Sequence, residues 1–327
     1  MTNKIFIWLL ATILVTTFSF AGAQQPAKVH RIGLLSGGSP GADPRIDVIR
    51  QGLRQLGYVE GQNISIESRW AEGRNDRFGE LAADLVRLKP DVIVVTTGEP
   101  AILALKQATD TIPIVMTSVG DPIGRVFIAS LARPGGNITG VSNQAVDLTG
   151  KWLELLKESA TKISQVAILR NPANPTHASF WREAQTTAQM LGLKVQDTEV
   201  RSPGDLESAF GTMTKAHAGA LVVLPDPMTA FNWPKIVNLT TKNRLPAISM
   251  FKEFAEAGGL IAYGPSPIEN ARRAPIYVDK ILKGAKAAEL PVEQPMKFYL
   301  VINLKAAKQI GLTIPPNVLV RADIVIR

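Results

Sequence analysis

Two stretches of the chain repeat the same order of short apolar runs and amphipathic helical segments. In the first half, residues 31–35 have the pattern of a short buried strand, residues 91–95 and 112–116 that of continuous apolar runs, and residues 63–69 alternate apolar with polar side chains. The second half repeats this order in the stretches QVAILRNPANP, MLGLKVQDTEV, GALVVLPDP and RLPAISMF. Strands that alternate with helices are typical of parallel βαβ units. The sequence therefore predicts an α/β fold with two doubly wound parallel-sheet lobes.

Several chain crossings, rather than one tether, are expected to join the two lobes. A turn-rich break at residues 133–137 marks the end of the first lobe. Residues 258–264 have the pattern of a strand that leaves the second lobe, and residues 298–302 have that of a strand that returns to it. Such a multi-strand hinge permits the lobes to close around a ligand. The expected lobes are an N-terminal lobe of residues 29–141 plus 264–295 and a C-terminal lobe of residues 142–263 plus 296–327.

Local signals mark some of the expected helix ends. Asn75 or Asp76 is a candidate N-cap for the helical pattern that follows, and Gly57 is a fitting stop signal near the end of the first helix. Pro275 falls inside an expected helix, which it is predicted to kink or restart.

The first 23 residues have the pattern of a secretory signal peptide. Lys4 gives a short positive region, residues 5–20 are apolar, and residues 21–23 (Ala-Gly-Ala) fit the small-x-small pattern before a cleavage site. The apolar run is shorter than the ~20 residues that cross a bilayer, which favours cleavage after Ala23 over a retained membrane anchor. The chain has no cysteine, so neither a disulfide nor a lipidated cysteine is available. We expect a mature protein that is free in the periplasm and monomeric.

The positive net charge does not indicate a nucleic-acid-binding protein. The formal charge is +8, but Lys and Arg are scattered and aromatic residues make up only 6% of the chain. Nucleic-acid binding needs a basic stripe with stacking aromatics. No spacing of histidines suggests a metal site, and no dinucleotide fingerprint follows the first strand, so neither a metal nor a cofactor is expected.

Polar residues follow the predicted strands where a ligand would bind, because ligands of open parallel sheets bind beyond the carboxyl ends of the strands. Small hydroxyl residues and glycines there would let backbone N–H groups approach a carboxylate, and an acidic side chain would pair with an ammonium group. These features suit a zwitterion such as an amino acid, although each residue is also an ordinary turn or cap residue. The candidate ligand-binding residues after the strands are Ser36, Gly37, Thr96, Thr97, Thr117, Asp121, Asn171, Asp226 and Tyr263. Glu99 and Asn174 lie in the same loops, and an aromatic wall is expected from Trp70, Phe231, Trp233, Phe251 and Tyr263.

The chain resembles the ABC transporter substrate-binding protein family that includes tryptophan-type binders, with a type I periplasmic binding fold. The resemblance extends over nearly the whole mature chain and includes GLRQLGYVEGQNISIESRWAEGR, DPIGRVFIASLARPGGNITG, FAEAGGLIAYGPS and KFYLVINLKAAKQIGLTIPP. It implies a periplasmic receptor for a small solute that serves an ABC permease in the inner membrane. It also implies an aromatic or branched amino acid as ligand, and it adds Ser142 to the candidate ligand-binding residues above.

Two other classes of function stay open from the sequence. A ligand-sensing partner of a membrane kinase or chemoreceptor would use the same cleft. A periplasmic enzyme is disfavoured, because the chain has only His30, His177 and His217 and lacks the G-x-S-x-G and H-E-x-x-H motifs. His177, near an expected helix start, is predicted to have a surface or capping role. The sequence therefore predicts a binding protein rather than an enzyme.

Overall fold

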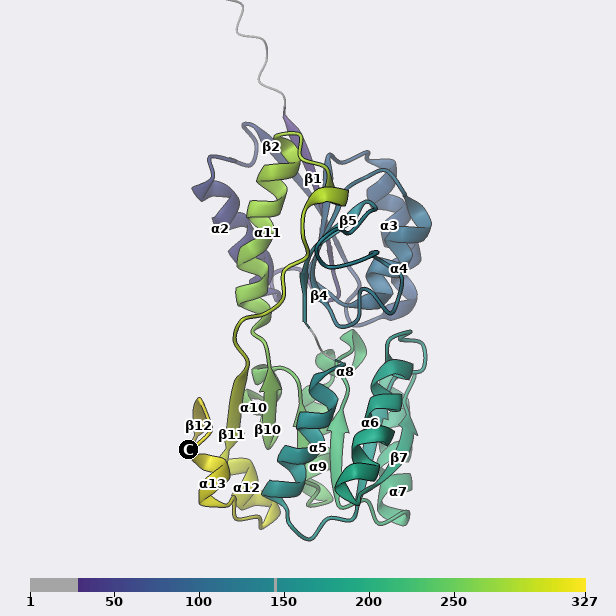
Figure 1. Cartoon of the computed structure of the whole chain (residues 1–327), viewed down its shortest axis with the longest axis vertical. Helices are drawn as coiled ribbons and strands as arrows, with labels where there is room; N and C mark the ends of the chain where they lie inside the picture. Colours follow the sequence, from purple (N-terminus) through teal and green to yellow (C-terminus); the bar gives the residue numbers. More distant parts are fainter. Residues whose placement is uncertain (1–28, 144–145) are drawn as a thin grey trace, which may run out of the picture.

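The computed structural model describes residues 29–143 and 146–327, which form two α/β lobes stacked along the long axis of the molecule (Figure 1). The predicted signal peptide, residues 1–23, lies outside the described residues. In the described part of the chain, no helix has the length and apolar character needed to cross a membrane.

The sheet of the N-terminal lobe is parallel throughout and has the order β2-β1-β3-β4-β5. Its strands are β1 (His30–Ser36), β2 (Ile64–Trp70), β3 (Val92–Val95), β4 (Ile114–Val119) and β5 (Ile138–Ser142). Successive side chains of a strand point to opposite faces. Leu34 accordingly packs on one face and Leu35 on the other, so each face has its own buried cluster.

Helices cover both faces of this sheet, as a doubly wound fold requires. α2 (Pro44–Gln55) and α11 (Pro267–Leu282) lie side by side on one face, and α3 (Phe78–Arg87) and α4 (Glu99–Ala108) cover the other (Figure 1). The short 3₁₀ helices η1 (Asn75–Arg77) and η3 (Ala287–Glu289) complete the lobe. Gly57, with a φ of +87°, follows the end of α2, where the sequence predicts a stop.

Pro275 lies inside a helix that continues over 267–282. Its ring packs against Gly52 of α2, where an added Cβ would lie 2.6 Å from the Pro275 Cγ. Only a glycine at 52 therefore lets the two helices approach this closely. A proline removes one backbone donor from a helix interior, and here its ring forms part of the contact between α2 and α11.

The sheet of the C-terminal lobe has the order β12-β11-β10-β9-β8-β6-β7. Its strands are β6 (Gln165–Arg170), β7 (Lys194–Glu199), β8 (Ala220–Val223), β9 (Ala247–Ser249), β10 (Ile261–Gly264), β11 (Tyr299–Asn303) and β12 (Ile324–Ile326). β11 runs antiparallel to β10, whereas the other neighbouring strands are parallel. The sequence did not predict this reversal, which arises because the chain re-enters the lobe from the hinge side.

Buried clusters lie on both faces of this second sheet as well. One face is covered by α5 (Leu148–Ser159), α6 (His177–Leu191), α12 (Leu304–Ile310) and α13 (Pro316–Leu319). The other is covered by α7 (Leu206–Lys215), which follows η2 (Pro203–Asp205), and by α9 (Trp233–Lys242) and α10 (Lys252–Glu256). The short helix α8 (Pro227–Phe231) lies at the junction of the two lobes (Figure 1).

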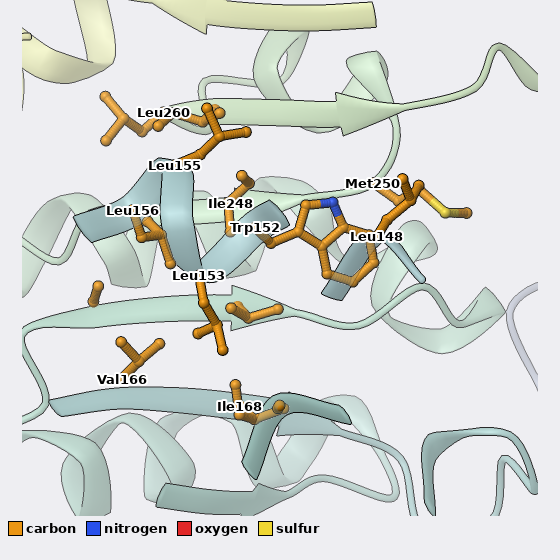
Figure 2. Packing of buried hydrophobic residues seen from close by; sticks show 14 of the residues in the cluster. Leu148, Trp152, Leu153, Leu155, Leu156, Val166, Ile168, Ile248, Met250 and Leu260 are labelled. Carbon is orange, nitrogen blue, oxygen red and sulfur yellow. The ribbon is translucent and has the colours of Figure 1, made fainter. Parts of the chain in front are cut away.

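Trp152 is the largest fully buried side chain and anchors the first of these clusters. It extends from α5 toward β9 and lies among Leu148, Ile248 and Met250 (Figure 2). Its ring stacks on Phe180 with centroids 6.0 Å apart, and its Nε1 donates to the Tyr263 carbonyl oxygen at 2.7 Å. The core of the lobe therefore reaches the strand ends that face the N-terminal lobe.

The chain passes between the lobes after β5, after β10 and before β11. The last passage begins along the outer edge of β5, where Glu293 N donates to Gly140 O and Ser142 N donates to Glu293 O, both at 2.9 Å. Asn143 and Asn270 flank the other two passages, and the Nδ2 of Asn270 donates to the Oδ1 of Asn143 at 2.7 Å. The hinge is therefore a bonded group of segments rather than a single flexible linker.

Candidate functional site

A cavity of about 220 Å³ lies between the lobes, at the carboxyl ends of strands from both sheets. The N-terminal lobe contributes the loops after β1, β3 and β4, and the C-terminal lobe contributes those after β6, β8 and β9. Residues that line it include Gly37, Asp43, Arg45, Thr97, Glu99, Ser118, Asn143, Asn174, Phe180, Asp226, Phe231, Trp233, Met250, Phe251 and Glu253.

The N-terminal lobe presents an ion pair to the cavity. The Asp43 carboxylate, 5% exposed, accepts from the Nε of Arg45 at 2.6 Å and from its Nη2 at 2.9 Å. The hydroxyls of Ser36 and Thr96 donate to the same carboxylate at 2.7 and 3.0 Å. Burial opposes ionisation of Asp43, but the Arg45 charge and these hydrogen bonds outweigh it and hold the pKa of Asp43 below its ordinary value. The pair is therefore fully ionised and held in one orientation.

Glu99 begins helix α4 and is buried at the cavity wall. Its Oε1 accepts from the backbone N–H of Gly120. Burial raises the pKa of Glu99 above its ordinary value, although hydrogen bonds to backbone N–H groups oppose the shift. Gly98, the residue before α4, provides no side-chain cap. Pro100 has no N–H, and Ala101 N donates to Gly98 O at 3.2 Å, so the first turn of α4 does not present a row of free donors to a ligand.

Asp226 connects the two lobes. It caps α8 by accepting from Met228 N at 2.9 Å, and it accepts from Asn174 Nδ2 at 2.9 Å and Asn171 Nδ2 at 3.3 Å. From the other lobe, Asn75 Nδ2 lies 3.0 Å from Asp226 Oδ2. Amide groups of the protein therefore already surround the Asp226 carboxylate. The carboxylate links the two lobes by hydrogen bonds and is not a free partner for an ammonium group.

Two glycines of the N-terminal lobe lie close to side chains of the C-terminal lobe. An added Cβ on Gly37 would lie 2.7 Å from Thr97 Oγ1 and 3.2 Å from the Pro227 Cβ of the opposite lobe. An added Cβ on Gly73 would lie 2.9 Å from Phe231. The lobes are therefore in contact at the rim of the cavity, which is a closed arrangement.

Aromatic side chains of the C-terminal lobe form the apolar wall of the cavity. Phe231, Trp233 and Phe251, which the sequence predicts for this role, line the cavity together with Phe180. Trp70 packs against the core of the N-terminal lobe, and Tyr263 packs against Phe298 with ring centroids 6.2 Å apart. These last two do not line the cavity.

The structure brings three of the predicted ligand-binding residues to the cavity wall, Gly37, Thr97 and Asp226. Ser36 and Thr96 hold Asp43, and Asn171 holds Asp226. The remaining predicted residues serve the protein itself away from the cavity. Thr117 and Ser142 donate to the carbonyl oxygens of Val95 and Val119, Asp121 accepts from Gly124 N, and Tyr263 accepts from Trp152.

Four polar residues at the wall were missed, namely Asp43, Arg45, Asn143 and Glu253. Asp43 had a usable signal, because Asp-Pro shortly after a glycine-rich loop indicates a capped helix start at a strand end. Arg45, two residues later, donates from its side chain to Asp43, the N-cap of the same helix. Nothing local in the sequence marks Asn143 or Glu253.

The prediction of a surface or capping role for His177 is wrong, because the side chain is fully buried. Its Nδ1 accepts from Asn171 N at 2.9 Å, so its Nε2 carries the proton and faces the Pro225 carbonyl oxygen at 3.2 Å. Burial lowers the pKa of His177, which therefore stays neutral, although the nearby Asp226 charge opposes the shift. The His177 ring therefore connects the loops after β6 and β8 through Asn171 N and the Pro225 carbonyl oxygen. No group of His, Asp and Glu in the described ranges is arranged to hold a metal ion.

Comparisons with known proteins agree with this geometry. A crystal structure of a conserved domain protein from Vibrio cholerae superposes with a TM-score of 0.83 at 28% identity, covering 91% of this chain and 100% of that one. The ABC domain in complex with L-Trp from Streptococcus pneumonia gives a TM-score of 0.82 at 28% identity, with the same coverage. A tyrosine-binding protein from Clostridioides difficile is 24% identical over 274 residues, which are 82% of this chain and 78% of that protein.

The neighbouring structures are type I periplasmic binding proteins, which confirms the predicted fold class. The model of the ABC transporter substrate binding protein family matches residues 35–326. This match includes every strand except the first five residues of β1, and every residue of the cavity wall described above. The chain therefore belongs to the ABC transporter substrate binding protein family.

Proposed function

We propose that this protein is a periplasmic receptor that encloses one amino acid, aromatic or branched, between its lobes and delivers it to an ABC permease. The observation that carries the proposal is the cavity itself, which joins an aromatic wall to the Asp43–Arg45 ion pair. Its volume of about 220 Å³ is below the ~300–1,000 Å³ of drug-sized sites. A molecule the size of one amino acid suits such a space.

The relatives support the same class of ligand. One is named for tyrosine binding, and another was solved with L-Trp bound. Substrate-binding proteins of this family act as receptors outside the cytoplasm rather than as enzymes, which supports export and a partner permease. Phe180, Phe231, Trp233 and Phe251 provide the surface that an aromatic side chain would contact.

The first expected result is ligand-dependent stabilisation. At a hundredfold excess over the dissociation constant, the cognate amino acid adds about 2.7 kcal/mol to the free energy of unfolding. For a protein of two lobes this raises the melting temperature by about 5–10 °C. The measurement is a thermal-shift screen of the L-amino acids on protein that has been unfolded, dialysed and refolded to remove bound solute.

A closure-blocking variant provides the control. Gly37→Val places a branched side chain against Pro227 of the opposite lobe and against Thr97 of its own lobe, so it opposes closure and also costs the N-terminal lobe some stability. The variant should melt below the wild-type temperature without ligand and should lose the ligand-dependent rise. Absence of any rise across the panel with wild-type protein would contradict amino-acid binding, and mass spectrometry of solute released from native protein would then name the ligand class.

A further inference from the structure

One acidic side chain at the cavity wall has a buried oxygen without a partner. Glu253 lies in the first turn of α10, directly after the loop that follows β9, and it lines the cavity. Its Oε2 is buried and has no hydrogen-bond partner. A buried polar atom without a partner is costly, so such an atom at a binding site indicates a donor that the ligand supplies.

The other acidic residues at the wall have their donors already. Asp43 is paired with Arg45, Asp226 is surrounded by amides, and Glu99 accepts from Gly120 N. Among the described residues of the wall, Glu253 alone has a buried carboxyl oxygen left over. Desolvation raises the pKa of Glu253, with a smaller contribution from Glu256, whereas the Lys252 and Arg45 charges oppose the rise. A cation delivered to this carboxyl would favour its ionised form.

The two lobes bring opposite charges to the cavity, Arg45 from the N-terminal lobe and Glu253 from the C-terminal lobe. Arg45 of the N-terminal lobe uses one N–H each of Nε, Nη1 and Nη2 on Asp43 and the Thr96 carbonyl. A guanidinium has five N–H donors, so two remain for a ligand carboxylate. Arg45 lies close enough to Glu253 to act on it through its charge, yet the two form no ion pair within 4.0 Å. A zwitterion would fit between them with its carboxylate toward Arg45 and its ammonium toward Glu253.

We propose that Glu253 accepts the ammonium group of the ligand, so that the cavity selects amino acids over the same acids without the amino group. This inference rests on the proposed function and names the residue that decides this selectivity. In this arrangement the N-terminal lobe binds the ligand carboxylate through Arg45, and the C-terminal lobe binds the ammonium group through Glu253 of α10.

The test compares each amino acid with its deamino analogue by calorimetry. The probes are L-tryptophan, L-tyrosine, L-phenylalanine and L-leucine, each paired with the acid in which hydrogen replaces the amino group. Wild-type protein should bind the best amino acid at least about tenfold more tightly than its deamino partner, because a charge-assisted hydrogen bond is lost. Glu253→Gln should remove most of that ratio by weakening the amino acid alone. Glu256→Gln, on the same helix but paired with Lys252 at the surface, is the matched control and should keep the ratio.

The outcomes separate the two proposals. If wild-type protein binds a deamino acid as tightly as the amino acid, the proposed role of Glu253 is wrong. The proposal that the cavity binds a molecule the size of one amino acid is then unaffected. If Glu253→Gln weakens both members of a pair equally, Glu253 supports the cavity wall and does not read the amino group. If no probe binds wild-type protein, the proposed function itself fails. Even if the variant does not fold, the wild-type ratio decides whether the cavity selects for the amino group.

Discussion

Asp226→Ala is expected to lose about 3 kcal/mol of folding free energy and most of its ligand affinity. The substitution removes the cap of α8, worth about 1 kcal/mol, and leaves the buried amides of Asn171 and Asn174 without their acceptor, which costs about 1–3 kcal/mol more. It also removes the hydrogen bond from Asn75 that holds the lobes together. Urea denaturation measures the first effect, and calorimetry with the cognate ligand measures the second.

Asn75→Ala separates these two effects, because it removes only the contact between lobes. A hydrogen bond to a charged group contributes about 1.5 kcal/mol, so the dissociation constant should rise about tenfold. The melting temperature of the ligand-free protein should change little. Asp76→Ala, next in the chain and paired only with the exposed Arg74, is the control and should leave affinity unchanged. Wild-type affinity in Asn75→Ala would show that closure does not depend on this contact.

Trp152→Ala is expected to cost about 3–5 kcal/mol, the range for removing a large aromatic from a core. Trp152 is fully buried, and its stack on Phe180 supports a side chain that lines the cavity. Ligand affinity should therefore fall together with stability. The measurement is chemical denaturation with a probe in each lobe, because lobes joined by a hinge need not unfold in one step.

Trp152→Phe is the matched comparison. It keeps an aromatic ring near Phe180 but leaves the Tyr263 carbonyl oxygen without its donor, which costs about 1–3 kcal/mol. The loss should therefore lie below that of Trp152→Ala. If both variants keep wild-type affinity, Phe180 does not need its neighbour to shape the cavity.

Much of the fold could be predicted from the sequence, because a buried parallel strand leaves a continuous apolar run whose side chains serve both faces. Leu34 and Leu35 show this directly, since each belongs to a different core cluster. The antiparallel direction of β11 could not be predicted in the same way. The run at 299–303 has the same apolar character whichever way it pairs, and only the route of the chain through the hinge decides its direction.

The site was harder to predict because hydroxyl and amide groups after a strand can serve either a ligand or the protein. Ser36 and Thr96 have the loop positions of ligand donors, but Asp43 lies close enough to accept from both. Asn75 has the pattern of an N-cap, but it donates across the cleft to Asp226, 151 residues away in the chain. Such choices depend on distances that folding sets between remote segments, which spacing along the sequence does not encode.

The position of α11 in the chain has a consequence for how the protein is made. All five strands of the first sheet have been synthesised by residue 142, yet the helix that packs against Ile49 and Leu53 of α2 spans residues 267–282. Contacts between segments so far apart form slowly, because a long loop must close first. Until residues 267–282 have reached the compartment where the protein folds, the first lobe therefore lacks α11 and leaves part of one apolar face of its sheet uncovered beside α2. A chain whose export stopped between the two lobes would leave an incomplete domain, which is a target for chaperones and proteases.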